Sequence, residues 1–309
     1  PTVMGTSGCA PSDNVPQSQA FSDVLPGVED TELKAGSDPN PCSVYVEDIY
    51  NYLRELEEKQ PIRPEYLAGQ DINGKMRARL IDWLVQVQLK LRLRQETLYT
   101  SVAIVDRFLQ DNPVAKTTLQ LVGVAAMFIA SKYEDRCHLN VGEFASKTEP
   151  AYTNAEVCQM EIKILQALDF NMSRPIPLHF LRRTSKIGKV VSFKQRILAK
   201  YLMELSIMDY CMVHIPPSKI AAAALCLALK LLNGCEWIPT LQQYMTYAES
   251  DLLPVMQHMA KNVILVNKSI TKNMTIKKKY DSKKYASISS IKQLDSCVIW
   301  NLAQPVMKK

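Results

Sequence analysis

Charged side chains interrupt two otherwise apolar segments between residues 76 and 109. Arg77, Asp82 and Asp106 lie among leucines and valines that recur three and four residues apart. This spacing predicts two helices, each with one apolar face, joined by a short polar turn. An unpaired charge in a packed helix is very costly, so we expect these side chains to be paired in the folded protein.

The residue types that commonly carry catalysis have no catalytic spacing. The four histidines are far apart in the sequence: His138, His179, His214 and His258. A Gly-rich phosphate loop, an HExxH metal motif and a nucleophile elbow are absent from the sequence. Eight cysteines lack C-x-x-C spacing, and Cys158 and Cys226 are interpreted as small buried hydrophobic residues. We therefore expect no enzymatic activity, metal or cofactor, and reduced thiols in the cytosol or nucleus.

The composition predicts a large helical protein without a membrane span. The 309 residues are 47% hydrophobic, enough for one large core or two of about 100 to 150 residues. The longest apolar run, residues 121–130, is too short to cross a bilayer, and no signal-peptide pattern opens the chain. The net charge of +6 is unevenly placed. Many of its lysines are close together: Lys268, Lys272, Lys277, Lys278, Lys279, Lys283 and Lys284.

This lysine cluster has two interpretations, a solvated basic face or a strip that binds phosphate or nucleic acid. Only tyrosines are interleaved with the lysines and no platform for stacking bases is evident, so the solvated face is favoured.

A weak internal repeat predicts two tandem helical domains in an all-α fold. The alanine-rich segment VAAMFIASK at 124–132 aligns with AAALCLALK at 222–230, so that Lys132 matches Lys230. Small side chains allow close backbone approach, which places such a helix at the centre of a bundle. Prolines mark the breaks between helices, and no strand alternation occurs.

These signals divide the chain into five parts. Residues 1–41 are rich in Pro, Ser, Gly and Asp and are expected to be disordered, and the start at Pro1 suggests a fragment without its natural beginning. Ser43 is the expected N-cap of a first helix, which Pro61 closes. The remaining parts are an N-terminal helix and linker at 42–70, a first repeat at 71–173, a second repeat at 174–275, and a C-terminal helical extension at 276–309.

The stretch MRARLIDWL, followed by ETLY and DRFL, resembles the cyclin box, and its flanks are similar to B-type mitotic cyclins. These flanks include YVEDIYNYLRELEEKQPIRPEYL, RPIPLHFLRR, LAKYLMEL and LLPVMQHMAKNV, so the resemblance runs from about Tyr45 to nearly the end. It implies two five-helix repeats and a non-catalytic regulatory subunit that activates the mitotic cyclin-dependent kinase, a serine/threonine kinase. It also implies control of entry into mitosis, help in selecting substrates, and movement from cytoplasm to nucleus at mitosis.

The resemblance assigns roles to four charged residues. Arg77 and Asp106 would form an internal pair that braces two helices, and Lys132 and Glu161 would lie at the kinase contact. From the residues alone, an intramolecular Lys132–Glu161 salt bridge without further role is favoured, whereas the resemblance favours the kinase contact. At this contact, the resemblance implies that the cyclin turns a glutamate of the kinase toward the kinase lysine that holds ATP.

The resemblance also implies a shallow groove that receives Arg-x-Leu motifs of kinase substrates. Arg79 and Gln86 stand where other cyclins have an isoleucine and an acidic residue, so we expect weaker docking than in those cyclins. For Trp83 and Met76, ordinary core packing is the alternative. The matching positions are Met76, Arg79, Trp83, Gln86, Leu119 and Gln120.

A third candidate site is a basic pocket for phosphorylated partners. Arg182 ends one predicted helix, and Arg196 and Lys200 lie one turn apart on the next. If the helices pack together, these side chains could hold a phosphate, as in B-type cyclins. The alternative is a solvated basic surface.

Two further functions remain as alternatives. A divergent or atypical cyclin would bind another cyclin-dependent kinase. A transcription-factor core uses the same tandem repeat on nucleic acid, but it would not need MRARLIDWL or the Lys132 and Glu161 pair.

Overall fold

The computed structural model describes residues 45–136, 139–147, 152–185, 191–233 and 237–308, with the side chains of 146–147, 184–185 and 233 excepted. The chain divides into two units, Pro1–Glu47 and Asp48–Lys309, and almost all described residues belong to the second. The expected disorder of residues 1–41 and the Ser43 cap lie outside the described residues.

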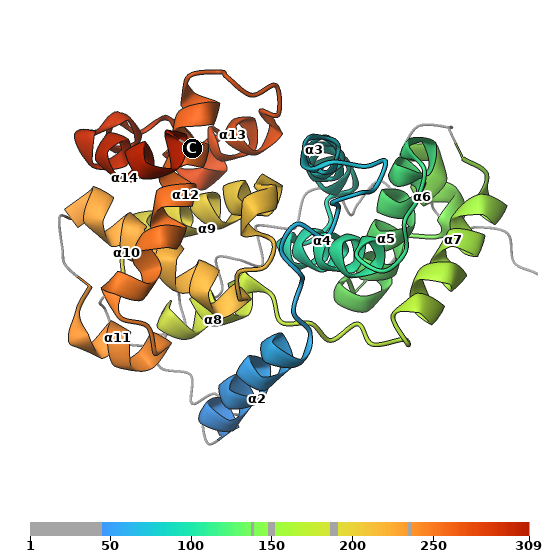
Figure 1. Cartoon of the computed structure of the whole chain (residues 1–309), viewed down its shortest axis with the longest axis horizontal. Helices are drawn as coiled ribbons and strands as arrows, with labels where there is room; N and C mark the ends of the chain where they lie inside the picture. The colour runs from blue at the N-terminus through green and yellow to red at the C-terminus, as the bar shows by residue number, and fades with distance from the viewer. Residues whose placement is uncertain (1–44, 137–138, 148–151, 186–190, 234–236, 309) are drawn as a thin grey trace, which may run out of the picture. The chain divides into compact units, whose positions relative to one another are not determined.

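The fold is all-α, as the sequence predicts, and no strand occurs within the described ranges. Helix α2 (Val46–Lys59) packs Tyr50 and Leu53 against the core of the second unit, while Ile49 is exposed. Five helices follow: α3 (Gly74–Leu91), α4 (Gln95–Leu109), α5 (Leu119–Glu134), α6 (Val141–Lys147) and α7 (Asn154–Ala167). Figure 1 shows them as one group.

A second group of helices follows the segment around residue 174 (Figure 1). It consists of α8 (Pro177–Ser185), α9 (Phe193–Met208), α10 (Pro217–Asn233), α11 (Pro239–Met245) and α12 (Glu249–Asn267). Helices α13 (Thr275–Tyr280) and α14 (Cys297–Met307) complete the described chain, and α14 packs along α12.

The alanine-rich helices α5 and α10 lie at the centres of the two groups. Ala125 and Ala130 of α5 and Ala223 and Ala228 of α10 have no exposed surface. Helix α5 packs against α3, α4 and α7, and α10 packs against α8, α9 and α12. Small side chains permit this approach on several sides, as the sequence pattern suggests.

One lysine of the C-terminal cluster is not solvated. Lys279 of α13 is buried, and its Nζ lies 2.7 Å from Oε1 of Glu204 on α9, which is also buried. The same Nζ donates to Oε1 of Gln88 on α3 at 3.2 Å. The interpretation of the whole cluster as a solvated face is therefore wrong at Lys279, whose charge links the C-terminal extension to both repeats.

Candidate functional site

The Arg77–Asp106 pair is a buried, bidentate ion pair between α3 and α4. Arg77 Nε lies 2.6 Å from Asp106 Oδ1 and Nη2 lies 2.7 Å from Oδ2. The Tyr66 hydroxyl donates to Oδ1 at 2.7 Å, and Arg77 Nη1 donates to the carbonyl of Ile207 in α9 at 2.8 Å. Burial alone would lower the pKa of Arg77, but the charge and hydrogen bonds of Asp106 more than offset it and raise that pKa.

The Asp82 carboxylate is stabilised by hydrogen bonds, whereas the sequence suggests an ion pair. Its carboxylate accepts hydrogen bonds from the backbone N–H of Thr275 at 3.0 Å and from the Thr275 hydroxyl at 2.7 Å. These hydrogen bonds replace a cationic partner and hold the start of α13 against α3.

Lys132 and Glu161 meet at the surface, on the last turn of α5 and on α7. They form an ion pair, with 38% of the Lys132 side chain and 12% of the Glu161 side chain exposed. Lys132 Nζ also lies 4.3 Å from the ring centroid of Phe128. Their sequence neighbours Tyr133 and Ile162 are 54% and 55% exposed. A charged pair beside two exposed hydrophobic residues is suited to a protein contact.

Tyr133 and Ile162 are not marked as contact residues by any motif in the sequence. A large hydrophobic residue next to a candidate contact residue is a weak signal, because helical periodicity alone does not say which side of a central helix is left uncovered. Their exposure depends on which faces of α5 and α7 the neighbouring helices cover.

The six predicted docking-patch residues come from α3 and the start of α5, which pack against each other. Met76 and Trp83 are half-buried and contact the core, whereas Arg79 and Gln86 are exposed on the same helix. Leu119 is buried, and Gln120 is half-buried. Gln86 Nε2 donates to the Thr275 hydroxyl at 3.2 Å.

Arg182 of α8 pairs with Glu96 of α4, and Arg94 Nη2 lies 2.8 Å from the same carboxylate oxygen. Burial alone would raise the pKa of Glu96, but Arg182, with help from Arg94, lowers it. Part of the Arg182 guanidinium is thus engaged with a carboxylate. Arg196 and Lys200 are half-buried, one turn apart on α9, and α9 contacts α8.

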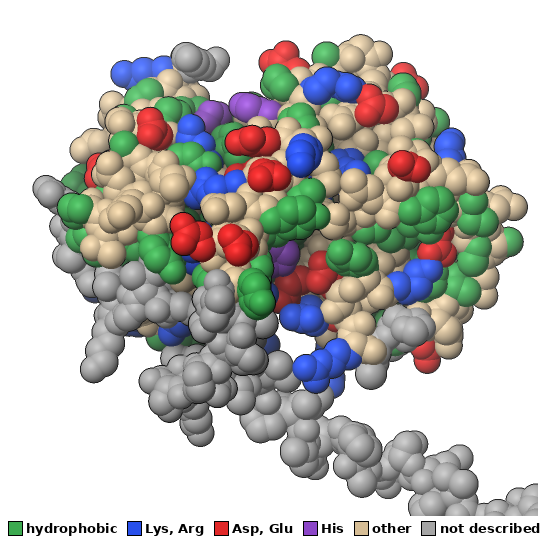
Figure 2. Space-filling view, turned by 90° about the horizontal axis from the view of Figure 1, so that it is seen from below, with side chains coloured by type: hydrophobic (Ala, Val, Ile, Leu, Met, Phe, Trp, Pro, Cys, Tyr) green, Lys and Arg blue, Asp and Glu red, His purple; other side chains and the backbone are tan. Residues whose placement is uncertain are grey.

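Charges of both signs share the molecular face seen in Figure 2. Hydrophobic side chains form separate patches there, with acidic and basic side chains between them. A continuous basic track, the usual footprint of nucleic-acid binding, does not cross the described part of this face. No group of three or more metal-ligating side chains occurs among the described residues. None of the described helices is long and apolar enough to cross a membrane.

In the described part of the chain, two groups of helices, each packed around a central alanine-rich helix, define a tandem helical-repeat protein of the cyclin-box type. Residues 48–173 match the family model "Cyclin, N-terminal domain" and residues 175–294 match "Cyclin, C-terminal domain". The chain belongs to the cyclin family, and its sequence places it with the B-type mitotic cyclins.

The relatives are similar along almost the whole chain. G2/mitotic-specific cyclin-B1 of Xenopus laevis is 56% identical over 307 residues, which cover 99% of this chain and 76% of the relative. The cyclin-B1 of Anguilla japonica is 56% identical over 304 residues, covering 98% and 74%. A viral cyclin from herpesvirus saimiri has a similar fold, with a TM-score of 0.60, 20% identity, and coverage of 74% of this chain and 99% of that one.

Proposed function

We propose that this chain is a regulatory subunit that binds and activates a mitotic cyclin-dependent kinase and so controls entry into mitosis. The observation that carries the proposal is the 56% identity to a G2/mitotic-specific cyclin-B1 along 99% of the chain. The chain supplies no catalysis of its own. It acts on the conformation of a serine/threonine kinase.

The kinase-binding surface is centred on Lys132 and Glu161. A subunit that binds the active arrangement of a kinase better than the inactive one shifts the kinase toward activity. Kinase chemistry requires an ion pair between a glutamate of the kinase's mobile helix and the lysine that holds ATP. Lys132 can offer hydrogen bonds to carbonyl groups of that mobile helix, with Glu161 fixing its direction, and Tyr133 and Ile162 add apolar contact.

A double substitution tests this surface. We expect Lys132→Ala with Glu161→Ala to reduce activation of the purified mitotic kinase, assayed on histone, by a factor of about 100 or more, since losses of about 3 kcal/mol are typical when central interface residues are removed. Thermal unfolding should change little, because surface ion pairs contribute at most about 1 kcal/mol. Unchanged kinase activity in the double variant would contradict the assignment.

The second repeat provides a matched control. Lys230, which aligns with Lys132 in the internal repeat, pairs with Glu249 at the start of α12. The Lys230 side chain is 30% exposed and the Glu249 side chain is 40% exposed, so this ion pair is also partly open to solvent. Lys230→Ala with Glu249→Ala removes the same kind of ion pair from the other repeat and should leave activation intact. If wild-type protein binds this kinase without activating it, a divergent cyclin for another kinase becomes the better proposal.

The basic residues Arg182, Arg196 and Lys200 form a second proposed contact, for phosphorylated partners of the complex. The packing of α8 against α9 supports it, although a phosphate must compete with Glu96 for Arg182. Arg182→Ala with Lys200→Ala should weaken phosphopeptide binding at least tenfold, measured by fluorescence polarisation, because charge-assisted hydrogen bonds are lost. Equal binding of the phosphopeptide to the wild type and to the double variant would contradict this proposal.

We also propose that the protein occupies the cytoplasm and moves to the nucleus at mitosis. Live imaging of a fluorescent fusion through one division tests this, and a constant distribution would contradict it.

A further inference from the structure

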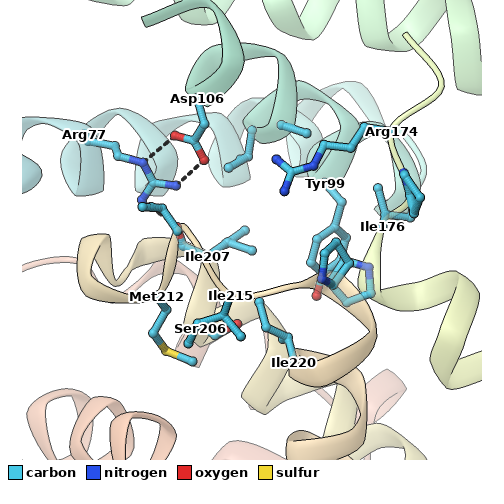
Figure 3. A pocket seen from close by; sticks show the side chains of 16 residues that line it. Arg77, Tyr99, Asp106, Arg174, Ile176, Ser206, Ile207, Met212, Ile215 and Ile220 are labelled. Atoms are coloured by element: carbon cyan, nitrogen blue, oxygen red, sulfur yellow. Dashed lines mark hydrogen bonds and ion pairs between the residues drawn. The ribbon is translucent and has the colours of Figure 1, made fainter. Parts of the chain in front are cut away.

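A cavity of about 70 Å³ lies between the two repeats (Figure 3). Helix α4 of the first repeat forms one wall, and residues from the segment at 174–177, α9 and α10 form the others. One water needs about 10–15 Å³ by the same measure, so the cavity has room for a small organic molecule. Most of its lining is apolar, with Val102, Ile176, Ile207, Ile215 and Ile220 among the contributors.

Arg174 brings an unpaired guanidinium into this apolar space. The Arg174 side chain is half-buried, and its Nε is buried without a hydrogen-bond partner among the described residues. In Figure 3 the guanidinium extends into the space between Asp106 and Tyr99. Burial lowers the pKa of Arg174 to about 10, and the neighbouring charge of Asp106 only partly opposes that effect.

The carboxylates that act on Arg174 are already engaged elsewhere. Asp106 accepts two hydrogen bonds from Arg77 and one from Tyr66. Glu57 accepts hydrogen bonds from the backbone N–H and the hydroxyl of Ser218, at the start of α10. An arginine that faces an apolar cavity is well matched to an anionic partner, because its guanidinium donates several hydrogen bonds in a fixed plane. Within the described ranges of the chain, no carboxylate forms an ion pair with Arg174.

Tyr99 contributes to the wall of the same cavity and carries a polar group without a hydrogen-bond partner among the described residues. Its hydroxyl is buried without a partner, while the rest of the ring packs in the core. Burial raises the pKa of Tyr99 well above its usual value, so the hydroxyl is a neutral donor.

We propose that the cavity is a binding site for a small carboxylate with a branched aliphatic body. The planar guanidinium of Arg174 matches a carboxylate in a two-bond arrangement, and the surrounding isoleucines match the aliphatic part. A phosphate would gain only one arginine and would bury its remaining oxygens against apolar walls. The site is independent of the proposed kinase contact, since none of its lining residues belongs to that surface.

Such a ligand would join the two repeats. It would contact α4 on one side and α9 and α10 on the other, so its binding stabilises the folded arrangement by mass action. Isovalerate is a suitable probe, and isovaleramide is its neutral match in size and shape.

The test is a titration of the full chain with isovalerate, followed by thermal unfolding and by methyl NMR of isoleucine. We expect isovalerate, at about ten times its Kd, to raise Tm by about 2–4 °C. The methyl signals of Ile207 and Ile215 should shift, and isovaleramide should bind at least tenfold more weakly. Equal effects of isovalerate and isovaleramide, or no methyl shift at these residues, would overturn the proposal.

Three variants locate the site. Arg174→Met keeps most of the side-chain volume and should weaken isovalerate binding at least tenfold. Ala103→Leu fills the cavity without touching the charge and should have the same effect, which covers the case that the Arg174 variant does not fold. Arg107→Met is the matched control, because Arg107 lies on the same helix α4 but does not line the cavity. Binding that survives the Ala103 substitution, or is lost equally with Arg107→Met, would contradict the assignment.

Discussion

At the scale of single residues, Arg77 joins the two repeats of the molecule. Its guanidinium pairs with Asp106 within the first repeat and donates to the carbonyl of Ile207 in the second. A buried pair is favourable only when all of its polar groups are satisfied. Here the Tyr66 hydroxyl donates to Asp106 and the Ile207 carbonyl accepts from Arg77, so both members of the pair have further hydrogen-bond partners.

Removing one member of this pair should be far worse than replacing both. We expect Arg77→Ala to lower the free energy of unfolding by about 3–5 kcal/mol, because Asp106 is left buried without its cation. The double variant Arg77→Met with Asp106→Leu should show a clearly smaller decrease in the free energy of unfolding. Urea unfolding followed by circular dichroism measures both changes.

The exposed pair of Arg63 and Asp111 provides a control. Arg63 Nη2 lies 2.7 Å from Asp111 Oδ1, with more than half of each side chain exposed. Arg63→Ala should cost at most about 1 kcal/mol. A similar loss in the Arg63 and Arg77 variants would mean that burial does not determine the contribution of the central pair.

The sequence indicates some buried charges of this protein and gives no sign of others. The apolar surroundings of Arg77 and Asp106 indicated that their charges had to be paired, and the family resemblance suggested the partner. Lys279 carried no such signal, because it lies among other lysines and its partner Glu204 is distant in the sequence. Only the packing of α13 against α9 shows that one lysine of the cluster is buried.

At the scale of helices, α3 presents one face to the core and another to solvent. The inward-facing positions follow from apolar periodicity, and the structure buries Leu80, Leu84 and Val87 as expected. Which helix covers the rest of α3 does not follow from the sequence. The hydrogen bonds from Thr275 to Asp82 bring α13 against it, across a sequence separation of 193 residues.

The exposed face of α3 leads to a prediction on substrate docking. Arg79 is exposed beside half-buried Met76 and Trp83, so it repels an incoming arginine and leaves less apolar area. We expect Arg79→Ile with Gln86→Glu to strengthen binding of an Arg-x-Leu peptide about tenfold, a gain of about 1.4 kcal/mol. Fluorescence polarisation with a labelled peptide measures this change.

Lys90 offers a matched control on the same helix. It is exposed near the C-terminal end of α3, so Lys90→Ile makes the same change of charge away from the patch. Its peptide affinity should equal that of the wild type. Equal gains in the Lys90 and Arg79 variants would show a non-specific effect of charge, and no gain in the double variant would remove the docking-patch assignment.

At the scale of the whole molecule, buried polar contacts connect the repeats to each other and to the C-terminal extension. Glu204 of α9 accepts hydrogen bonds from Lys279, Tyr280 and Gln95, the last of which belongs to α4. The internal repeat predicted two similar domains, but it carried no information about this shared centre. Long-range polar contacts of this kind depend on three-dimensional packing rather than on local sequence.

The same docking of helices gives the molecule a pH dependence through His179 of α8. Burial, with a smaller contribution from the charge of Arg182, lowers the pKa of His179 from 6.5 to about 4. Between these two values the unfolded chain binds a proton at this side chain and the folded chain does not. The contribution of His179 to stability is therefore complete above pH 6.5 and is lost as the pH falls toward 4.

Glu57 and Glu134 oppose this trend. Burial raises the pKa of each carboxyl group, so these residues favour the folded state below the usual glutamate pKa and lose that contribution as the pH rises. The pH dependence of the wild type alone is a sum of both effects, and the His179 contribution has to be taken as a difference between proteins.

We expect His179→Asn to remove the His179 contribution. Urea unfolding at a series of pH values measures this contribution. Between pH 6.5 and pH 4.5, the free energy of unfolding of the wild type should fall by about 1–2 kcal/mol more than that of the variant. The full pKa shift corresponds to about 3 kcal/mol, and the expected value is smaller because the His179 ring is partly exposed. His214→Asn is the control, because His214 is exposed at the surface and this variant should follow the wild type. If all three proteins have the same pH dependence, the imidazole of His179 is protonated in the folded state at these pH values, and α8 does not pack against the first repeat tightly enough to exclude the charge.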